Sequence, residues 1–270
     1  MIDKEKSKIA LHIAYDGSAY HGWQRQSAQP SVQAAIEKAL SQVADEPIQL
    51  MVSGRTDKGV HASFQVAHFD CQSIRPLSAW VKGGNVHLPQ DISILNAYHV
   101  DDDFHARYQA KWRTYRYFVW QDPIMMPWAR MGWTHYPYQL NHDAMQEAAQ
   151  HCLGENDFSS FRAAYCQSLS THRNIKDIQI TTNQYGCTMT VTGNAFLHHM
   201  VRNIMGSLFW VGQGKRSAQW MQELLLCHDR TQAGPTAPAN GLWLIGIDFG
   251  KLYSDVSGLK CPYEWMSEVK

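Results

Sequence analysis

The chain has no C-x-x-C pair: its six cysteines are scattered through 270 residues, and no export signal precedes them. Cysteines in this arrangement are typical of buried free thiols rather than of disulfides or a zinc site. Long apolar runs are also missing, because stretches such as LWLI at 242–245 fall far short of the roughly 20 residues that span a bilayer. We therefore expect a cytoplasmic protein with no membrane segment.

An excess of charge of either sign is absent, since Lys and Arg together number 24 and Asp and Glu also number 24. Zero net charge argues against a protein held to nucleic acid by bulk charge, because phosphate binding depends on clustered cations. One cluster does occur: ARYQAKWRTYR at 106–116 places four cations among aromatic residues without an acid. The cluster fits a partner held locally in a groove, and it equally fits a solvated strand face.

Common cofactor and metal motifs are missing as well. The chain has no Walker loop, no dinucleotide-binding glycine pattern, no HExxH and no nucleophile elbow. Among its 14 histidines only the adjacent pair His198 and His199 invites a metal hypothesis. On a helix these two would point about 100° apart, and neither has an acidic or histidine partner four residues on. We therefore expect neither a metal nor a cofactor.

The apolar pattern predicts strands alternating with a few helices. Strands are expected at 9–15, 48–53, 64–70, 93–100, 114–121, 177–183, 187–193 and 241–249. Helices are expected at 31–44, where Ser31 is the N-cap, and at 141–153, 198–214 and 218–226.

This order predicts an α+β protein of two similar domains, because each half offers strands, a helix and more strands. Each domain is expected to be a mostly antiparallel sheet with helices on one face, and a cleft is expected between the two. The boundary falls near residue 105: an N-terminal domain at 1–105 and a C-terminal domain at 106–270. A chain of 270 residues is comfortable for two domains.

The segment SGRTDKGVHA at 53–62 places an aspartate at a glycine-rich bend, between cations. A hairpin turn would explain an isolated Asp beside Gly. Evidence from other segments is therefore needed to assign a catalytic role to Asp57. Other segments also look too specific for packing alone. They are YDGSAYHGWQRQ at 15–26, RTYRYFVW at 113–120, FLHHMVRNIMG at 196–206 and AGPTAPANGLWL at 233–244.

Taken together, these segments resemble the tRNA pseudouridine synthase A family, and the resemblance extends from Ile9 to Phe249. It implies an isomerase that turns uridine into pseudouridine at positions 38, 39 and 40 of the tRNA anticodon stem-loop. The family breaks the N1–C1′ bond of the flipped uridine and rejoins the sugar through C5, without cofactor or metal. It also implies a homodimer with tRNA across both subunits. The tail at 258–270 has no counterpart in this resemblance.

The resemblance carries roles onto individual residues. Asp57 matches the catalytic aspartate, whose anion can attack either C1′ or C6, and Arg202 matches the basic residue that pairs with it. Tyr115 matches an active-site tyrosine that can stack on the base, and its hydroxyl is a candidate base for the C5 proton. Leu242 matches an apolar residue that packs against the flipped base. Arg55 matches an arginine that engages the tRNA as the nucleotide leaves its stack.

Two other classes of function were compared with this one. An RNA-binding module without activity would have no reason to place a carboxylate among phosphate-facing arginines, where it weakens affinity. A nucleoside glycosidase would need a second carboxylate or a water-activating group, and none stands near these motifs. The hypothesis of an isomerase is therefore favoured. Contacts with tRNA phosphate are expected from local cations: Arg55, Lys58, Arg107, Lys111, Arg113 and Arg116.

Overall fold

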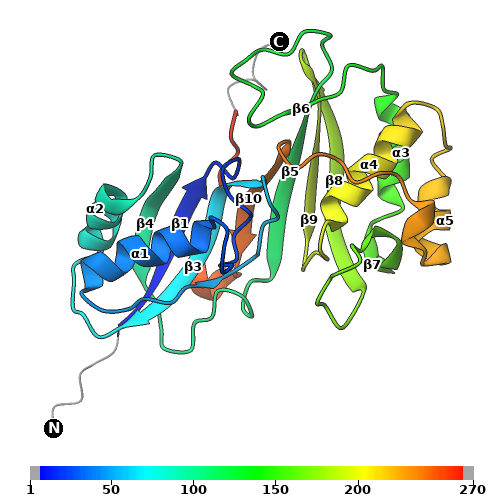
Figure 1. Ribbon diagram of the computed structural model, residues 1–270. Coiled ribbons are helices and arrows are strands. Elements are labelled where there is room, and N and C mark those ends of the chain that lie inside the picture. The colour runs from blue at the N-terminus through cyan, green and yellow to red at the C-terminus, as the bar shows by residue number, and fades with distance from the viewer. Residues whose placement is uncertain (1–6, 264–270) are drawn as a thin grey trace. The chain divides into compact units, whose positions relative to one another are not determined.

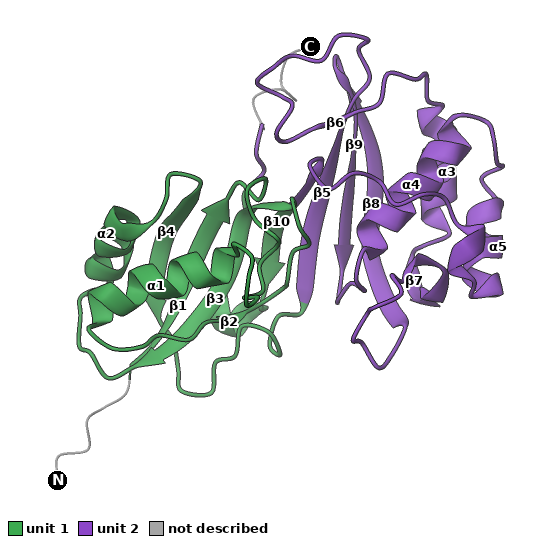
Figure 2. Ribbon diagram, viewed as in Figure 1, with its two compact units in different colours: residues 1–111, 244–260 green, residues 112–243, 261–270 purple. Residues whose placement is uncertain are grey.

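The computed structural model describes residues 7–263, and these residues divide into two compact units (Figure 2). The first unit comprises residues 7–111 and 244–260, and the second comprises residues 112–243 and 261–263. The chain therefore returns to its first unit after completing most of the second. Across the described residues, no helix is long and apolar enough to cross a membrane.

The first unit is a sheet with two helices. Its strands follow the hydrogen-bonded order β4-β1-β3-β10, while β2 pairs with β3 and β11 with β10. The pairings of β1 with β3 and β4, of β2 with β3 and of β10 with β11 are antiparallel. The strands are β1 (Ser7–Tyr15), β2 (Met51–Val52), β3 (His61–Cys71), β4 (Ile92–His99), β10 (Leu242–Asp248, most of which lies in this unit) and β11 (Gly258–Leu259).

Helix α1 (Val32–Ala44) begins where the sequence predicts. The Ser31 side chain accepts a hydrogen bond from the backbone N–H of Ala34, which satisfies one of the donors exposed at a helix start. Its apolar residues lie on the buried side, as the periodicity indicated. In Figure 1, α1 and the second helix of this unit, α2, cover the same face of the sheet.

Helix α2 (Leu77–His87) was not predicted. Gly83 and Gly84 lie in its interior and favour other conformations by roughly 1 kcal/mol each relative to alanine. Packing explains Gly84, because a Cβ there would lie 2.6 Å from the Ile94 side chain, whereas a Cβ at Gly83 would make a milder contact, 3.1 Å from the side chain of Val43. Close contact with β4 and α1 therefore outweighs weak intrinsic helix propensity.

The second unit is a sheet with three helices among the described residues. Its strands follow the hydrogen-bonded order β5-β9-β8-β7, and each neighbouring pair in this order is antiparallel. Strand β6 pairs with β5 in parallel. The elements are β5 (Trp112–Trp120), β6 (Thr134–His135), α3 (His142–Gln150), β7 (Gly154–Asp157), β8 (His172–Asn183), β9 (Gly186–Gly193), α4 (Met200–Gly212) and α5 (Trp220–Cys227).

Helix α3 lies against both the sheet and α4. The Gln146 side chain accepts from the backbone N–H of Ile180 on β8, at 2.6 Å. A Cβ at Gly212, the last residue of α4, would lie 2.6 Å from the sulfur of Met145 on α3. The prediction of an α+β fold with mostly antiparallel strand pairing is thus confirmed, as are the predicted hairpin at 177–193 and the four predicted helices.

Candidate active site

Asp57 lies in the loop that joins β2 to β3, as the sequence predicts. The backbone N–H of Val60 donates to the carbonyl of Asp57 at 3.1 Å and closes a tight turn. Gly59 has a φ of +76° in this turn, a conformation that favours glycine. Asp57 is partly exposed and Arg55 is exposed, whereas Thr56 between them is buried. The turn thus buries the side chain of Thr56 and leaves those of Arg55 and Asp57 accessible to solvent.

This loop rests on the segment 16–23, which belongs to the YDGSAYHGW motif. The backbone N–H of Trp23 donates to the carbonyl of Thr56 at 3.1 Å, and that of Gly59 donates to the carbonyl of Tyr20 at 3.3 Å. The hydroxyls of Tyr15 and Thr56 lie 2.8 Å apart in a hydrogen bond. Burial raises the pKa of Tyr15 to about 12, so this hydroxyl stays protonated and serves as a structural contact.

Two glycines of that motif allow the two segments to touch. A Cβ at Gly17 would lie 2.0 Å from the carbonyl oxygen of Val60. A Cβ at Gly22, whose φ is +93°, would lie 2.6 Å from the carbonyl oxygen of Thr56. Both clashes are with backbone, which cannot turn aside. The spacing of glycines in YDGSAYHGW therefore follows from its contact with the Asp57 loop.

Asp16 and His61 form a further tie between the same segments. Nδ1 of the fully buried His61 lies 3.1 Å from a carboxylate oxygen of Asp16 and 3.1 Å from the backbone nitrogen of Gly17. The contact with His61, together with hydrogen bonds from the N–H and hydroxyl of Ser18, holds the pKa of Asp16 well below its usual range. Asp16 is thus an anion that orders the loop beneath Asp57.

The other end of the Asp57 loop is fixed by Gln65, a residue that sequence reasoning missed. Gln65 lies on β3 and is fully buried. Its side-chain oxygen accepts from the Ser53 hydroxyl at 2.7 Å, and its side-chain nitrogen donates to the carbonyl of Gly54 at 2.7 Å. A glutamine between the apolar residues Phe64 and Val66 was the available signal, because buried amides require partners.

In the second unit, Tyr115 lies on β5 and is 7% exposed. Its ring packs edge-on against Phe196, with the ring centroids 5.1 Å apart and the planes at 82°. Such a pairing restricts the orientation of the ring. Two residues further along the same face of β5, the buried hydroxyl of Tyr117 contacts the carbonyl of Pro238 at 2.8 Å and the hydroxyl of Thr134 at 2.6 Å.

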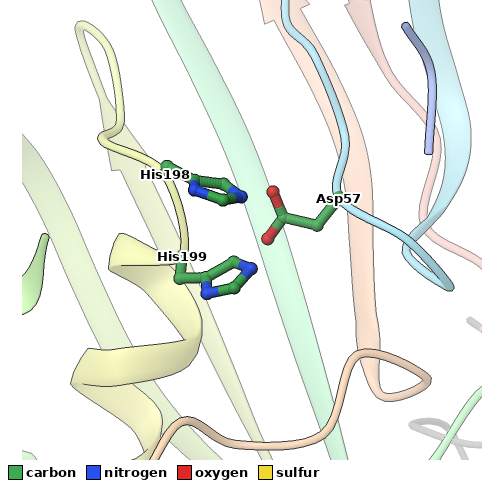
Figure 3. Close-up of side chains that lie close together, drawn as sticks. All are labelled: Asp57, His198 and His199. Atoms are coloured by element: carbon green, nitrogen blue, oxygen red, sulfur yellow. The ribbon is translucent and has the colours of Figure 1, made fainter. Parts of the chain in front are cut away.

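The two adjacent histidines precede α4 rather than lying within it. Residue His199 has a φ of +62°, so the helix begins at Met200, two residues later than predicted. The imidazole rings of His198 and His199 lie 4.0 Å apart. Figure 3 shows these two side chains, which come from the second unit, and that of Asp57, which comes from its loop in the first unit. Carboxylate and imidazole are groups that can bind a metal, and the expectation of a metal-free site stays a prediction.

Arg202 lies in the first turn of α4, because the helix begins at Met200. It is partly buried, and its Nε donates to the carbonyl of Ala237 at 2.8 Å. The backbone N–H of Ala237 in turn donates to the carbonyl of Arg202 at 3.1 Å. Burial raises the pKa of Tyr117, while the Arg202 charge and the bond with Thr134 act against that rise. The arginine therefore lies among α4, β5 and the loop 233–241.

That loop packs directly on the helix through two more glycines. A Cβ at Gly206 on α4 would lie 1.7 Å from the carbonyl oxygen of Pro235, and one at Gly234 would lie 2.6 Å from the carbonyl oxygen of Gly206. At the end of the loop, the backbone N–H of Leu242 donates to the carbonyl of Ala239 at 2.9 Å. Leu242 begins β10 and is 4% exposed.

Asn203, also missed by sequence reasoning, organises this region from inside. It is fully buried on α4, and its side-chain nitrogen donates to the carbonyl of Phe161 at 2.8 Å. Its side-chain oxygen accepts from the Thr236 hydroxyl at 2.6 Å and from the Arg230 guanidinium at 3.0 Å. One amide thus joins α4 to Phe161 and to the stretch 230–236. The only signal in the sequence was an amide side chain within the largely apolar stretch MVRNIMG.

The structure divides the cations that were expected to contact phosphate. Arg55, Lys58, Arg107 and Lys111 are exposed. Arg113 is 8% exposed and its guanidinium donates to the carbonyl of Asn194 at 2.6 Å. Arg116 is partly buried, and its Nε donates to the Thr190 hydroxyl at 2.9 Å. Arg113 and Arg116 thus hold β5 against its neighbours.

Comparison with known proteins agrees with the motif pattern. A family profile described as "tRNA pseudouridine synthase" matches residues 11–109 and 148–250. A protein of Shewanella woodyi is 50% identical over 242 residues, which are 90% of this chain and 93% of the relative. A protein of Actinobacillus pleuropneumoniae serotype 7 is 50% identical over 90% of this chain and 92% of the relative. A protein of Vibrio cholerae is 47% identical over the same shares. All three relatives are named "tRNA pseudouridine synthase A".

Proposed function

The chain belongs to the tRNA pseudouridine synthase family, and from this we propose that it isomerises uridine to pseudouridine at positions 38, 39 and 40 of the tRNA anticodon stem-loop. The single observation that supports this most is the 50% identity over 90% of the chain. The family profile match covers the Asp57 loop and α4. As an isomerase it neither adds nor removes atoms: N1 of the base leaves C1′, C5 takes its place, and the C5 proton is exchanged for one on N1.

Asp57 is the proposed catalytic residue. Cleavage of the N1–C1′ bond leaves electron deficiency at C1′, and a carboxylate can attack or stabilise that centre. Attack at C6 of the base is the alternative, because an adduct there also frees the base to rotate. Either course needs the carboxylate at a fixed position. The ties from the loop to Trp23, Tyr20 and Tyr15 support this role.

Arg202 is the proposed cationic partner of the Asp57 carboxylate. Its planar guanidinium suits a carboxylate, since two N–H groups can donate in parallel. Its Nε already donates to Ala237, which fixes the direction of the remaining donors. A cation held in this way stabilises the ionised form of a carboxylate in a site that excludes water.

Tyr115 and Leu242 are proposed to hold the flipped uridine, and Arg55 to support the tRNA that the base has left. The Tyr115 ring, fixed by Phe196, can stack on the base, and its hydroxyl is one candidate for removing the C5 proton. Extruding a base costs a few kcal/mol, which an exposed guanidinium that grips phosphate can partly offset. The exposure of Arg55 is consistent with that task.

The same proposal extends to the architecture and the setting. The two compact units support a division into two similar domains. We propose an N-terminal domain at 1–105 that carries the Asp57 loop and a C-terminal domain at 106–270 that carries Tyr115 and Arg202. The strand at 244–248 returns to the first unit. We infer a substrate cleft between their sheets. We also infer a homodimer that acts on tRNA in the cytoplasm, with no cofactor or metal.

A map of pseudouridine in unmodified tRNA treated with the purified protein tests this function. Selective chemical labelling of pseudouridine followed by reverse transcription should place new stops at positions 38, 39 and 40 and nowhere else. A protein that binds the tRNA without producing pseudouridine would be an RNA-binding module, and release of free uracil would identify a glycosidase. Either of these results would overturn the proposal.

A further inference from the structure

The second unit carries a basic segment outside the residues considered so far. From Phe158 to Lys176 the chain contains no Asp or Glu, and it includes Arg162, Arg173 and Lys176. Two apolar side chains in this segment face solvent: Tyr165 is 92% exposed and Leu169 is fully exposed. An exposed aromatic ring beside cations is available to stack on a nucleic-acid base.

Arg162 and Arg173 shape this loop from within. The Arg162 guanidinium donates to the carbonyls of Cys166 and Ser168, at 2.6 and 3.1 Å. The Arg173 guanidinium donates to the carbonyls of Ser170 and His172, at 3.1 and 2.5 Å, and to the Ser168 hydroxyl at 2.6 Å. A guanidinium has five N–H donors, so both keep donors beyond those the loop uses. Among the described residues, the buried Nε of Arg173 has no hydrogen-bond partner.

The positive charge of this pair is not balanced by protein. Within residues 7–263, neither Arg162 nor Arg173 forms an ion pair with a carboxylate. Burial lowers the pKa of Arg173, and the nearby Arg162 charge adds to that effect. Burial would raise the pKa of the Cys166 thiol, but hydrogen bonds and the Arg162 charge bring it below its usual value. The partly exposed Cys166 thiol thus lies beside backbone N–H donors and the Arg162 guanidinium.

The segment is also tied to the start of α4. The backbone N–H of Ala163 donates to the carbonyl of His198 at 3.1 Å, and the Cys166 sulfur accepts from the N–H of His198 at 3.5 Å. Arg202 follows four residues later on the helix. An anion bound by the guanidinium pair would therefore lie on the same framework that positions Arg202.

We propose that Arg162 and Arg173 bind a backbone phosphate of the substrate RNA, and that Tyr165 stacks on a neighbouring unpaired base. The inference rests on the proposed function for the identity of the RNA. A planar guanidinium pair with spare donors and no carboxylate matches the geometry and charge of a phosphate. An adjacent exposed aromatic is the usual platform for single-stranded bases. The phosphate contact would hold the anticodon loop beside α4 while a uridine is extruded.

Alkylation of Cys166 tests the proposal in the unaltered protein. The probe is an RNA hairpin with the anticodon stem-loop sequence and cytidine in place of uridine at the three target positions, so that it binds without reacting. Iodoacetamide labelling is then resolved by mass spectrometry at Cys166 and at the exposed Cys227 of the same unit. We expect the hairpin to slow labelling at Cys166 several-fold, by shielding and by raising the thiol pKa, and to leave Cys227 unchanged.

A charge variant provides the second measurement. Arg173→Gln should weaken hairpin binding and reduce the slope of log affinity against log salt by roughly 0.7–0.9, the loss of one phosphate contact. Arg173→Lys should keep part of the slope. The matched control is Arg216→Gln, which removes an exposed arginine that lies over Trp220 in the same unit and should change neither quantity.

The outcomes are distinct. Saturating hairpin that leaves Cys166 labelling unchanged, or an Arg173→Gln protein with the full salt slope, would overturn the phosphate site. Inorganic phosphate that slows Cys166 labelling where the hairpin does not would show a site for free anions and would also overturn it. Protection in the unaltered protein remains interpretable even if Arg173→Gln misfolds. Protection without pseudouridine formation on normal tRNA would reject the proposed activity and leave the phosphate site standing.

Discussion

Nδ1 of His61 lies 3.1 Å from a carboxylate oxygen of Asp16, and this contact joins the first residue of β3 to the loop after β1. The histidine is fully buried, while the aspartate is 40% exposed. The pair lies under the Asp57 turn, whose last residue is Val60. Stability of this region should therefore depend on the ionisation of Asp16.

Asp16→Asn should destabilise the protein more at neutral pH than in acid. The folded state lowers the pKa of Asp16 below its ordinary value of 3.8, so the carboxylate contributes stability above that pH. As the pH falls below about 4, the unfolded chain takes up the proton first and the contribution declines. Urea unfolding at pH 7 and at pH 3 should show a difference between variant and wild type that shrinks in acid. Asp70→Asn, at a 62% exposed aspartate near Lys8, is the control and should show little difference at either pH.

Asp57→Asn should abolish isomerisation and keep tRNA binding. The amide preserves the size of the side chain and removes the anion, so turnover should fall on the order of 10³-fold or more. Binding should be unchanged or slightly tighter, because one negative charge near RNA phosphate is lost. Single-turnover assays and filter binding measure the two quantities. Near-native turnover in this variant would show that another group attacks the substrate.

Tyr115→Leu should cripple turnover while leaving the salt dependence of tRNA affinity unchanged, because stacking releases no counterions. Tyr115→Phe separates the two tasks of the residue, since it keeps the ring beside Phe196 and removes the hydroxyl. A loss of turnover in the phenylalanine variant equal to that in the leucine variant would assign the C5 proton to the hydroxyl. Neutralising Lys111, which is exposed, is the complementary change and should flatten the salt slope. A reduced slope in Tyr115→Leu would contradict the distinction.

Prolonged dialysis against a chelator should leave activity intact. The proposed chemistry uses a carboxylate on the sugar or the base and needs no Lewis acid. The measurement is pseudouridine formation before and after treatment, on tRNA refolded in the same buffer so that loss of RNA structure is controlled. Activity that is lost and then restored by zinc would show that the reaction depends on a metal ion and would contradict the prediction.

Gly206→Ala should lower the free energy of unfolding by at least about 2 kcal/mol, because the new Cβ would lie 1.7 Å from a backbone carbonyl that cannot turn aside. Gly83→Ala is the matched control within a helix. There the nearest atom is a valine methyl at 3.1 Å, and the gain in helix propensity of roughly 1 kcal/mol offsets the contact. Thermal unfolding of both variants checks the prediction. Equal stability of Gly206→Ala and wild type would show that the loop can move away from the helix.

The sequence predicted elements whose pattern is local. Helix α1 follows from its N-cap serine and apolar periodicity, and the hairpin β8–β9 from two alternating runs. Helix α2 could not be predicted, because its two glycines weaken the local helix signal and only its packing against α1 and β4 stabilises it. The start of α4 was also misplaced, since the left-handed conformation of His199 depends on its surroundings.

The candidate site shows the same division. The motifs pointed to Asp57, Arg55, Tyr115, Arg202 and Leu242, and their roles stay predictions. The buried amides that support them, Gln65 and Asn203, were not foreseen, since their partners come from distant parts of the chain. Likewise, nothing local distinguishes a cation committed to its own sheet, such as Arg113, from one that faces solvent. Tertiary hydrogen bonding decides both questions.

The contact between Gly206 and Gly234 has a kinematic consequence. Loop 233–241 cannot move independently of α4, because the carbonyl of Pro235 occupies the space that a side chain at Gly206 would fill. The hydrogen bonds between Arg202 and Ala237 hold the loop at the same place. The helix and the loop must therefore move as one rigid body, and the hydrogen bond between the Thr236 hydroxyl and the Asn203 side chain strengthens this connection. Any opening that admits a nucleotide beside Leu242 would then displace Arg202 by a comparable amount, so that entry of the base and placement of the charge are a single motion.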